Sequence, residues 1–347
     1  MSLVKLFDST LRDGSHAIKH QFTRKNISDY CRAIDSAGMS TVIVGHGNGL
    51  GASSLQVGLS LLSDSEMLQT AKKNLKKTRL GAYMIPGFGT IKDNLIPAIE
   101  TGVDVFQIGC HCTEADTTKQ HIEFLRSRNK HVYGVLMMYH MASAERILEE
   151  AKKMESYGAY GVILMDSAGA STPEMVEQTV RLLSTNLDIS VGFHPHNNMG
   201  LAVANAYTAI KSGATIIDGT LNGFGAGAGN CQLEALQALL DKENINTNAD
   251  LYKMLDVSDG VMPTIGARPI LDSLSIVSGQ AGIFSAFKVH VQRAAKEFKV
   301  DPRDILLELG KRKAVGGQED MIIEIAEKLS SPCGGNSAEE YQIGALL

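Results

Sequence analysis

The sequence predicts a closed α/β barrel of the TIM type, followed by a helical C-terminal domain. Eight short apolar runs alternate with longer stretches of helical periodicity, and the runs carry no alternating polar face. Continuous apolar character is typical of parallel strands covered on both sides, and eight strand–helix units in a row predict this barrel. Strand-like runs then cease after about residue 260. We therefore expect a barrel over residues 1–260 and a helical domain over residues 261–347.

An open, doubly wound sheet is the alternative fold for the same alternation. That fold needs a glycine-rich phosphate-binding turn after an early strand, and the segment FDSTLRDG is not such a turn. The barrel is therefore the better interpretation. Its strands are expected, in chain order, at residues 4–7, 41–46, 79–84, 103–108, 132–137, 161–166, 189–194 and 214–219.

Sequence patterns typical of helix starts and helix ends lie between these strands. Thr172 followed by Pro173 is typical of a helix start, and Gly38, Gly158 and Gly213 each follow the last apolar residue of a helical pattern, where helices commonly end. The barrel helices identified in this way cover residues 24–38, 143–158, 172–184 and 199–213. In the C-terminal domain, helical patterns cover residues 273–298, 301–311 and 318–330, and the tail at 330–340 is expected to be a loop.

Composition narrows the class of protein. The chain has 347 residues, of which 44% are hydrophobic, and a net charge of −5 without any basic run, so a nucleic-acid partner is not expected. The longest apolar runs are too short to span a bilayer, and the N-terminus shows no signal-peptide pattern. Five cysteines form an odd number without framework spacing, which indicates reduced thiols and predicts a cytoplasmic protein.

Polar side chains gather where the predicted strands end. The C-terminal ends of barrel strands meet at one mouth, so these side chains are expected to form the active site. The first strand is followed by Arg12, Asp13 and His16, and the seventh ends with His194 and His196. The ends of the second and sixth strands add His46, Asn48, Asp166 and Ser167.

These positions predict a metal site. In an extended chain His194 and His196 project to the same side, and together with Asp13 they provide three ligands with open positions. Nitrogen and oxygen ligands without a thiolate suit Mn²⁺, Mg²⁺ or Zn²⁺. The alternative is a turn whose imidazole rings only form hydrogen bonds, but the position at a strand end favours the metal site. The CHC motif at 110–112 is not expected to bind zinc, because no second pair of ligands accompanies it.

Two residues beside this site have side chains that are suited to catalysis. Arg12 could hold a carboxylate or stabilise an enolate oxygen, or it could only pair with Asp13 or Asp8 and shape the loop. His16 has an ordinary pKa of about 6.5, which suits a general base, although a surface histidine is the alternative.

The glycine-rich run at 223–229 precedes a helix expected near Asn230. It lacks the Lys-Ser/Thr pair of a phosphate-binding loop, so we interpret it as a packed turn below the site.

Several motifs together carry a family resemblance. They are STLRDGSHAIKHQ, VGHGNGLGASS, CHCTEADTTKQHIEF, LMMYHM, MESYGA, MDSAGA, HPHNNMGLAVANA, GFGAGAGN and KAVGGQEDMI. The chain resembles the 4-hydroxy-2-oxovalerate aldolases of the DRE-TIM metallolyase superfamily, over residues from about 3 to 330. The superfamily also contains the 3-hydroxy-3-methylglutaryl-CoA lyases. The Arg-Asp pair and the HxH motif are shared by the superfamily, whereas GSHAIKHQ and VGGQEDM are more specific to the aldolases.

The resemblance implies a mechanism. A divalent cation, usually Mn²⁺ but also one such as Mg²⁺ or Co²⁺, would be held by Asp13, His194 and His196 and chelated by the 2-oxo acid substrate. Arg12 would stabilise the pyruvate enolate, His16 would act as base and Ser167 would contact the substrate. The resemblance also implies an oligomer and an acylating aldehyde dehydrogenase as partner, with the C-terminal helices carrying part of that assembly.

One departure from the family pattern concerns a tyrosine hydroxyl. The family places a tyrosine that reaches the substrate in a GxYSxF-like stretch, where this chain has Phe284 in GIFSAF. A phenyl ring has no hydroxyl to donate or accept. Tyr139, after the fifth strand, is a candidate to supply the missing hydroxyl from the other side of the mouth, or it is a rim aromatic without a role.

Three other functions compete with the aldolase. The first is an acyl-CoA condensation or lyase on the same scaffold, although nothing in the sequence indicates a coenzyme A site. The second is an iron oxygenase, which uses the same ligand set but would leave Arg12 and His16 idle. The third is a structural partner of a dehydrogenase, which would have no need of the complete set of reactive residues.

Overall fold

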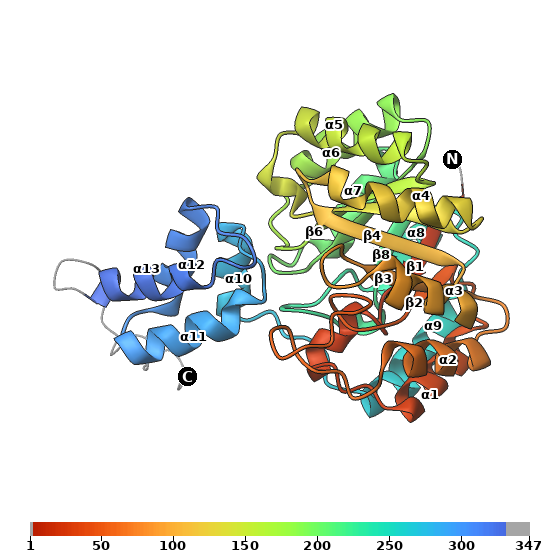
Figure 1. Cartoon of the computed structure of the whole chain (residues 1–347), viewed down its shortest axis with the longest axis horizontal. Helices are drawn as coiled ribbons and strands as arrows, with labels where there is room; N and C mark the ends of the chain where they lie inside the picture. Colours follow the sequence, from red (N-terminus) through yellow and green to blue (C-terminus); the bar gives the residue numbers. More distant parts are fainter. Residues whose placement is uncertain (1–2, 331–347) are drawn as a thin grey trace.

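The structure is a computed structural model, and it describes residues 3–330. Eight parallel strands close into a barrel in which each strand pairs with its neighbours in chain order and β8 returns to β1 (Figure 1). The strands are β1 (Lys5–Asp8), β2 (Thr41–Ile43), β3 (Arg79–Met84), β4 (Val105–His111), β5 (His131–Met137), β6 (Gly161–Asp166), β7 (Ser190–Pro195) and β8 (Ile216–Gly219). The predicted TIM barrel is confirmed, with a strand at each of the eight expected places.

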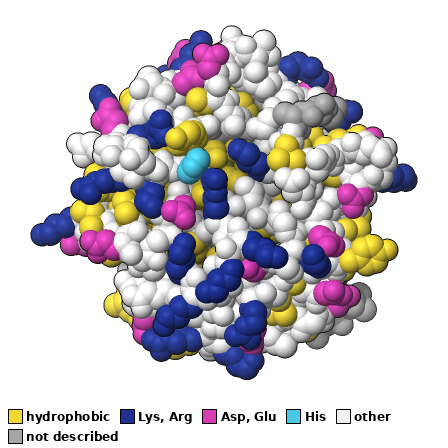
Figure 2. All heavy atoms as spheres, turned by 90° about the vertical axis from the view of Figure 1, so that its right-hand side faces the viewer, with side chains coloured by type: hydrophobic (Ala, Val, Ile, Leu, Met, Phe, Trp, Pro, Cys, Tyr) yellow, Lys and Arg dark blue, Asp and Glu magenta, His cyan; other side chains and the backbone are white. Residues whose placement is uncertain are grey.

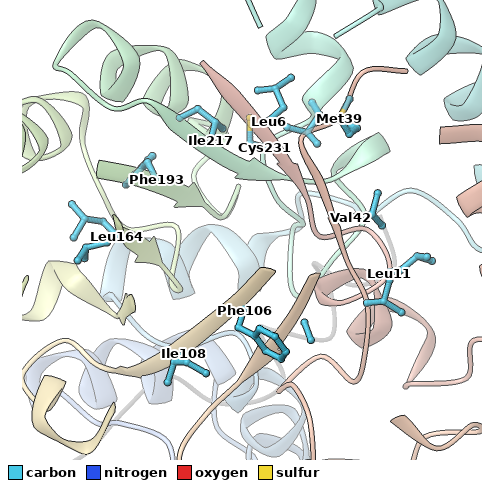
Figure 3. Packing of buried hydrophobic residues seen from close by; sticks show 14 of the residues in the cluster. Leu6, Leu11, Met39, Val42, Phe106, Ile108, Leu164, Phe193, Ile217 and Cys231 are labelled. Carbon is cyan, nitrogen blue, oxygen red and sulfur yellow. The ribbon is translucent and has the colours of Figure 1, made fainter. Parts of the chain in front are cut away.

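Side-chain alternation divides the strand residues into two cores. One set points into the barrel and includes Phe7, Tyr83 and Met165. The other set packs between the strands and the surrounding helices, and Figure 3 shows part of it around Leu6, Leu164, Phe193 and Ile217. Successive strand residues face opposite sides. His194 is therefore placed inside the barrel because its neighbour Phe193 packs outside.

Helices cover the outside of the barrel and form the C-terminal lobe. Thr172 caps α6 by accepting a hydrogen bond from the main-chain N–H of Met175, as expected for this Thr-Pro start. The helices are α1 (Arg24–Ile34), α2 (Asp64–Asn74), α3 (Ile96–Thr101), α4 (Lys119–Ser127), α5 (Ala144–Ser156), α6 (Pro173–Asn186), α7 (Ala202–Lys211), α8 (Leu233–Lys242), α9 (Leu251–Gly260), α10 (Ser273–Ala281), α11 (Phe287–Phe298), α12 (Pro302–Lys311) and α13 (Asp320–Ser330).

Helices α10 to α13 form a lobe with its own hydrophobic core beside the barrel (Figure 1). The expected helical stretch at 273–298 is two helices, because Gly282 adopts a left-handed conformation (φ +69°) that ends α10. The segment between α10 and α11 contacts the barrel: Nε2 of His140 lies 3.2 Å from the Gly282 carbonyl oxygen. The expected tail loop at 330–340 lies, after residue 330, outside the described residues.

The face of the barrel that lies away from the C-terminal lobe carries many charged side chains. Figure 2 shows the face opposite the C-terminal lobe, where Lys and Arg side chains gather among scattered acidic ones and apolar side chains form only small separate patches. Among residues 3–330, no helix combines the length and the apolar character needed to cross a membrane.

Candidate active site and metal centre

The turn after β1 places a buried ion pair at the mouth of the barrel. Nη1 of Arg12 donates a 2.8 Å hydrogen bond to Oδ1 of Asp13, and both side chains are almost fully buried. The Arg12 guanidinium also lies 4.8 Å from the centroid of the Tyr83 ring, which belongs to the interior core. Nη1 of Arg12 also approaches the Gly47 carbonyl and Nη2 approaches the Ser9 hydroxyl, each at 3.5 Å. Arg12 is thus fixed beside Asp13 rather than exposed on a loop.

The end of β7 brings two histidines to the same place. Asp13, His194 and His196 each offer a ligand atom, and the three atoms lie within 4.8 Å of one another. They are the only such cluster of potential metal ligands within residues 3–330. The three residues singled out from the sequence are therefore brought together, although 181 residues separate Asp13 from His194.

The polar atoms of this cluster fit a cation. Nδ1 of His196 lies 3.0 Å from the main-chain oxygen of Asp166, and Nε2 of the same ring lies 3.7 Å from Oδ2 of Asp13. Within the described part of the chain, both ring nitrogens of His194 and Oδ1 of Asn230 are buried without a hydrogen-bond partner. Buried polar atoms are rarely left unpaired, so orphaned acceptors beside a carboxylate point to a missing positive ligand.

Electrostatics keeps Asp13 and His196 in the protonation states that bind metals. Burial opposes the charge on Asp13, but the Arg12 guanidinium and His196 hold the pKa of that carboxyl well below its usual range. Burial lowers the pKa of His196 to about 4, and the neighbouring Asp13 offsets only part of this effect. At neutral pH the site therefore offers an ionised carboxylate and a neutral imidazole, which are the forms that bind metals.

His16 lies at the edge of this site among other imidazole rings. Its ring packs edge-on against His20 at a centroid distance of 5.0 Å, and His20 stacks on His46 at 3.6 Å. A Cβ added to Gly47 would meet Nε2 of His16 at 2.3 Å, so the ring lies directly on the loop after β2. Burial lowers the pKa of His16, which keeps the ring in its basic, neutral form.

Ser167 and Tyr139 occupy different surroundings. Ser167 follows β6, is nearly buried and accepts a 3.2 Å hydrogen bond from the main-chain N–H of Met138. Tyr139 packs edge-on against Phe193, at a centroid distance of 5.9 Å, in the core between the barrel and the helices. Met138 has a left-handed φ of 54°, which turns the chain between β5 and Tyr139. The structure therefore places Tyr139 in the outer core and not with the three metal ligands.

The glycine-rich run differs from the expectation. We expected a packed turn below the site, but the loop lies against Asp13: Oδ2 of Asp13 accepts hydrogen bonds from the main-chain N–H of Ala226 (3.2 Å) and from the side-chain amide of Asn230 (2.6 Å). The helix expected near Asn230 begins at Leu233. Asn230 was missed as a site residue because the glycine run before it is weak evidence of function, although the motif GFGAGAGN that it ends was among those that carry the family resemblance.

Comparisons with known proteins show which family the chain belongs to. The HMGL-like family model matches residues 3–261, and the DmpG-like communication domain model matches residues 269–331. A 4-hydroxy-2-oxovalerate aldolase of Pectobacterium atrosepticum is 50% identical over 343 residues, which cover 98% of this chain and 99% of that protein. The chain belongs to the 4-hydroxy-2-oxovalerate aldolase family. Another member, from Spirochaeta aurantia, is 51% identical over 94% of this chain and 96% of its own length. As a member of the aldolase family, the chain is a carbon–carbon lyase.

Solved structures share the fold at lower identity. A Bacillus subtilis HMG-CoA lyase superposes with a TM-score of 0.66 at 19% identity, covering 79% of this chain and 97% of that one. The carboxyl transferase domain of Rhizobium etli pyruvate carboxylase, in a structure with pyruvate, superposes with a TM-score of 0.77 at 15% identity and covers 96% of this chain and 61% of that one. These similarities extend the barrel architecture of the aldolase family to more distant proteins.

Proposed function

We propose that this chain cleaves 4-hydroxy-2-oxopentanoate, or a related 4-hydroxy-2-oxo acid, to pyruvate and an aldehyde, and that the reaction depends on a divalent cation. The observation that carries the proposal is the convergence of Asp13, His194 and His196 beside Arg12 at the barrel mouth. The names of the relatives support the substrate class.

The cation would be held by those three residues. Their nitrogen and oxygen ligands suit Mn²⁺, Mg²⁺ or Co²⁺, and Mn²⁺ is our first choice. When bound, such an ion supplies a Lewis acid that polarises the 2-oxo carbonyl of the substrate.

His16 is the proposed general base. It takes the proton from the C4 hydroxyl, the C3–C4 bond breaks, the C4 oxygen becomes the carbonyl of the aldehyde and the electron pair passes to C3. A proton returned to C3 completes pyruvate. The lowered pKa of His16 keeps its ring neutral at pH 7, as a base must be. No lysine is needed for this route, because the electron sink is the carbonyl and not a Schiff base.

Arg12 is the proposed stabiliser of the enolate. Its guanidinium is buried and fixed by Asp13 and the Tyr83 ring, so its charge needs no reorganisation when the enolate oxygen becomes negative. Ser167, at the end of β6, is a proposed substrate contact. We do not extend this role to Tyr139, whose contacts lie in the outer core.

An acylating aldehyde dehydrogenase is the proposed partner, in an oligomeric assembly, and it would receive the aldehyde. The match of residues 269–331 to a communication-domain model supports an interaction through the C-terminal lobe.

The test is pyruvate release from 4-hydroxy-2-oxo acids that yield aldehydes of increasing length, with lactate dehydrogenase and NADH as the reporter. We expect turnover with short aldehydes and no release of free coenzyme A from acyl-CoA substrates. Release of coenzyme A without pyruvate formation from any 4-hydroxy-2-oxo acid would instead support an acyl-CoA lyase.

A further inference from the structure

A second carboxylate lies beneath the proposed metal centre and has no part in the mechanism above. Asp218, in β8, is completely buried, and its Oδ2 lies 3.3 Å from Nδ1 of His194. It pairs in register with Phe7 of β1, a residue of the interior core, so its side chain also points into the barrel. A buried carboxylate is costly unless other groups compensate its charge, so its surroundings are informative.

Two further donors fix this carboxylate. The Ser9 hydroxyl donates a 2.7 Å hydrogen bond to Oδ1, and the Gln107 side-chain amide donates a 2.9 Å hydrogen bond to Oδ2. Gln107 lies in β4, which is opposite β8 in the ring of eight strands, so this hydrogen bond crosses the barrel interior. Both oxygens of Asp218 are therefore oriented by residues that stand outside the set of metal ligands.

The position of Asp218 favours one tautomer of His194. The contact between Oδ2 of Asp218 and Nδ1 of His194 is an ion-pair contact and not an aligned hydrogen bond. Because an ionised carboxylate attracts a ring proton and cannot donate one, it favours the tautomer that carries the proton on Nδ1 and keeps the lone pair on Nε2. Nδ1 of His196 instead faces a neutral partner, the main-chain oxygen of Asp166, at 3.0 Å. The two imidazoles thus present the same nitrogen to the site, but only His194 is backed by a negative charge.

We propose that Asp218 is a positioning residue for the metal centre: it fixes the tautomer and orientation of His194 and strengthens cation binding through its charge. Gln107 and Ser9 in turn orient Asp218. Carboxylates that back a metal-ligating histidine make the ring a stronger ligand, and their loss commonly weakens metal affinity by about 10- to 100-fold. This inference rests on the proposed function, because it requires Asp13, His194 and His196 to hold a cation.

The test compares Mn²⁺ binding to the metal-stripped full chain and its variants, measured by electron paramagnetic resonance of free Mn²⁺. Asp218→Asn keeps the shape and removes the charge, and we expect its dissociation constant to rise about 10- to 100-fold. The matched control is Asp8→Asn, which removes a buried carboxyl from the neighbouring strand β1, where the partners are Tyr30 and Thr10 rather than a metal ligand. We expect the control to bind Mn²⁺ as the wild type does. The turnover of Asp218→Asn should recover as the Mn²⁺ concentration is raised. An unfolded variant would not recover in this way.

Three results would overturn the inference or the proposal on which it rests. If the wild type binds Mn²⁺ and Asp218→Asn binds it within twofold of Asp8→Asn, the role of Asp218 is wrong and the proposed function stands. If the wild type binds no stoichiometric divalent cation, the proposed function itself fails. If Asp218→Asn does not fold, Gln107→Met is the second variant, because it removes only the donor that crosses the barrel to Asp218. We expect Gln107→Met to bind Mn²⁺ more weakly than the wild type. Unchanged Mn²⁺ binding by this variant would also contradict the inference.

Discussion

The side-chain amide of Asn230 donates a 2.6 Å hydrogen bond to Oδ2 of Asp13, although 217 residues separate them. They meet because β1 and β8 are neighbours in the closed barrel, so the loops that follow these strands lie together. Arg12 holds the other oxygen of Asp13. Both oxygens of the proposed metal-binding carboxylate are therefore oriented by the chain itself.

Gly225→Ala should disturb this arrangement. A Cβ at Gly225 would lie 1.9 Å from Nδ2 of Asn230 and 2.4 Å from Oδ2 of Asp13, so both side chains must move. We expect Mn²⁺ affinity to fall by about 10-fold or more, as for loss of an orienting partner. Isothermal titration measures this, with Gly260→Ala as control because nothing lies within 4 Å of a Cβ there. Equal affinity in the two variants would contradict the role given to the loop.

Gly47→Ala should impair catalysis without affecting the metal. The new Cβ would lie 2.3 Å from Nε2 of His16, which is the free end of a side chain and can be displaced without unfolding the protein. Displacement of a general base by about 1 Å can reduce kcat by about 100-fold. Steady-state kinetics at saturating Mn²⁺ should show this loss, while Mn²⁺ affinity matches that of the wild type and of Gly260→Ala and the protein stays folded. Unchanged kcat would remove His16 from the mechanism.

Arg12→Lys should reduce kcat more than it weakens substrate binding. An ammonium keeps the charge but loses the fixed planar group that now contacts Asp13, Gly47 and Ser9. Loss of one preorganised donor to a developing oxyanion costs about 10²- to 10³-fold in kcat. The measurement is kcat and KM for pyruvate release. A rise in KM alone would show that Arg12 only binds the substrate.

The stacked pair His20 and His46 should make stability depend on pH. Burial lowers the pKa of His20 to about 3 and that of His46 to about 4, against an ordinary value of 6.5. At pH values between these lowered pKa values and 6.5, the unfolded chain binds more protons than the folded one. The free energy of unfolding therefore rises with pH and falls as the pH is lowered from about 6.5 towards 4.

His20→Asn tests this pH dependence, because asparagine does not titrate and tolerates the left-handed φ of 61° at this position. Urea unfolding at several pH values gives the free energy of unfolding as a function of pH. Its slope against pH should correspond to about one proton fewer in the variant than in the wild type. Parallel curves for wild type and variant would show that His20 is protonated alike in both states.

Much of this architecture was predictable from local patterns. The apolar runs gave all eight strands, and the rule that barrel strands end at one mouth brought Asp13, His194 and His196 into one cluster. The break at Gly282 was not predictable, because the residues on both sides of it have helical periodicity. The contribution of Asp218 depends on register and on a donor from the opposite strand, which no local pattern encodes.

The position of Tyr139 could not be predicted from the sequence for a different reason. Its place directly after the fifth strand made it a candidate to face the mouth, but the left-handed Met138 turns the chain between β5 and Tyr139 and the ring packs on Phe193. The substrate panel described above also measures the consequence of Phe284 at the family tyrosine position.

The most direct test of the central claim is pyruvate formation from 4-hydroxy-2-oxopentanoate by metal-stripped protein, before and after reloading with Mn²⁺, for the wild type and His196→Ala. We predict that stripping abolishes activity, that Mn²⁺ restores it in the wild type and that His196→Ala neither binds the ion tightly nor recovers. Full activity of the stripped wild type would contradict the account.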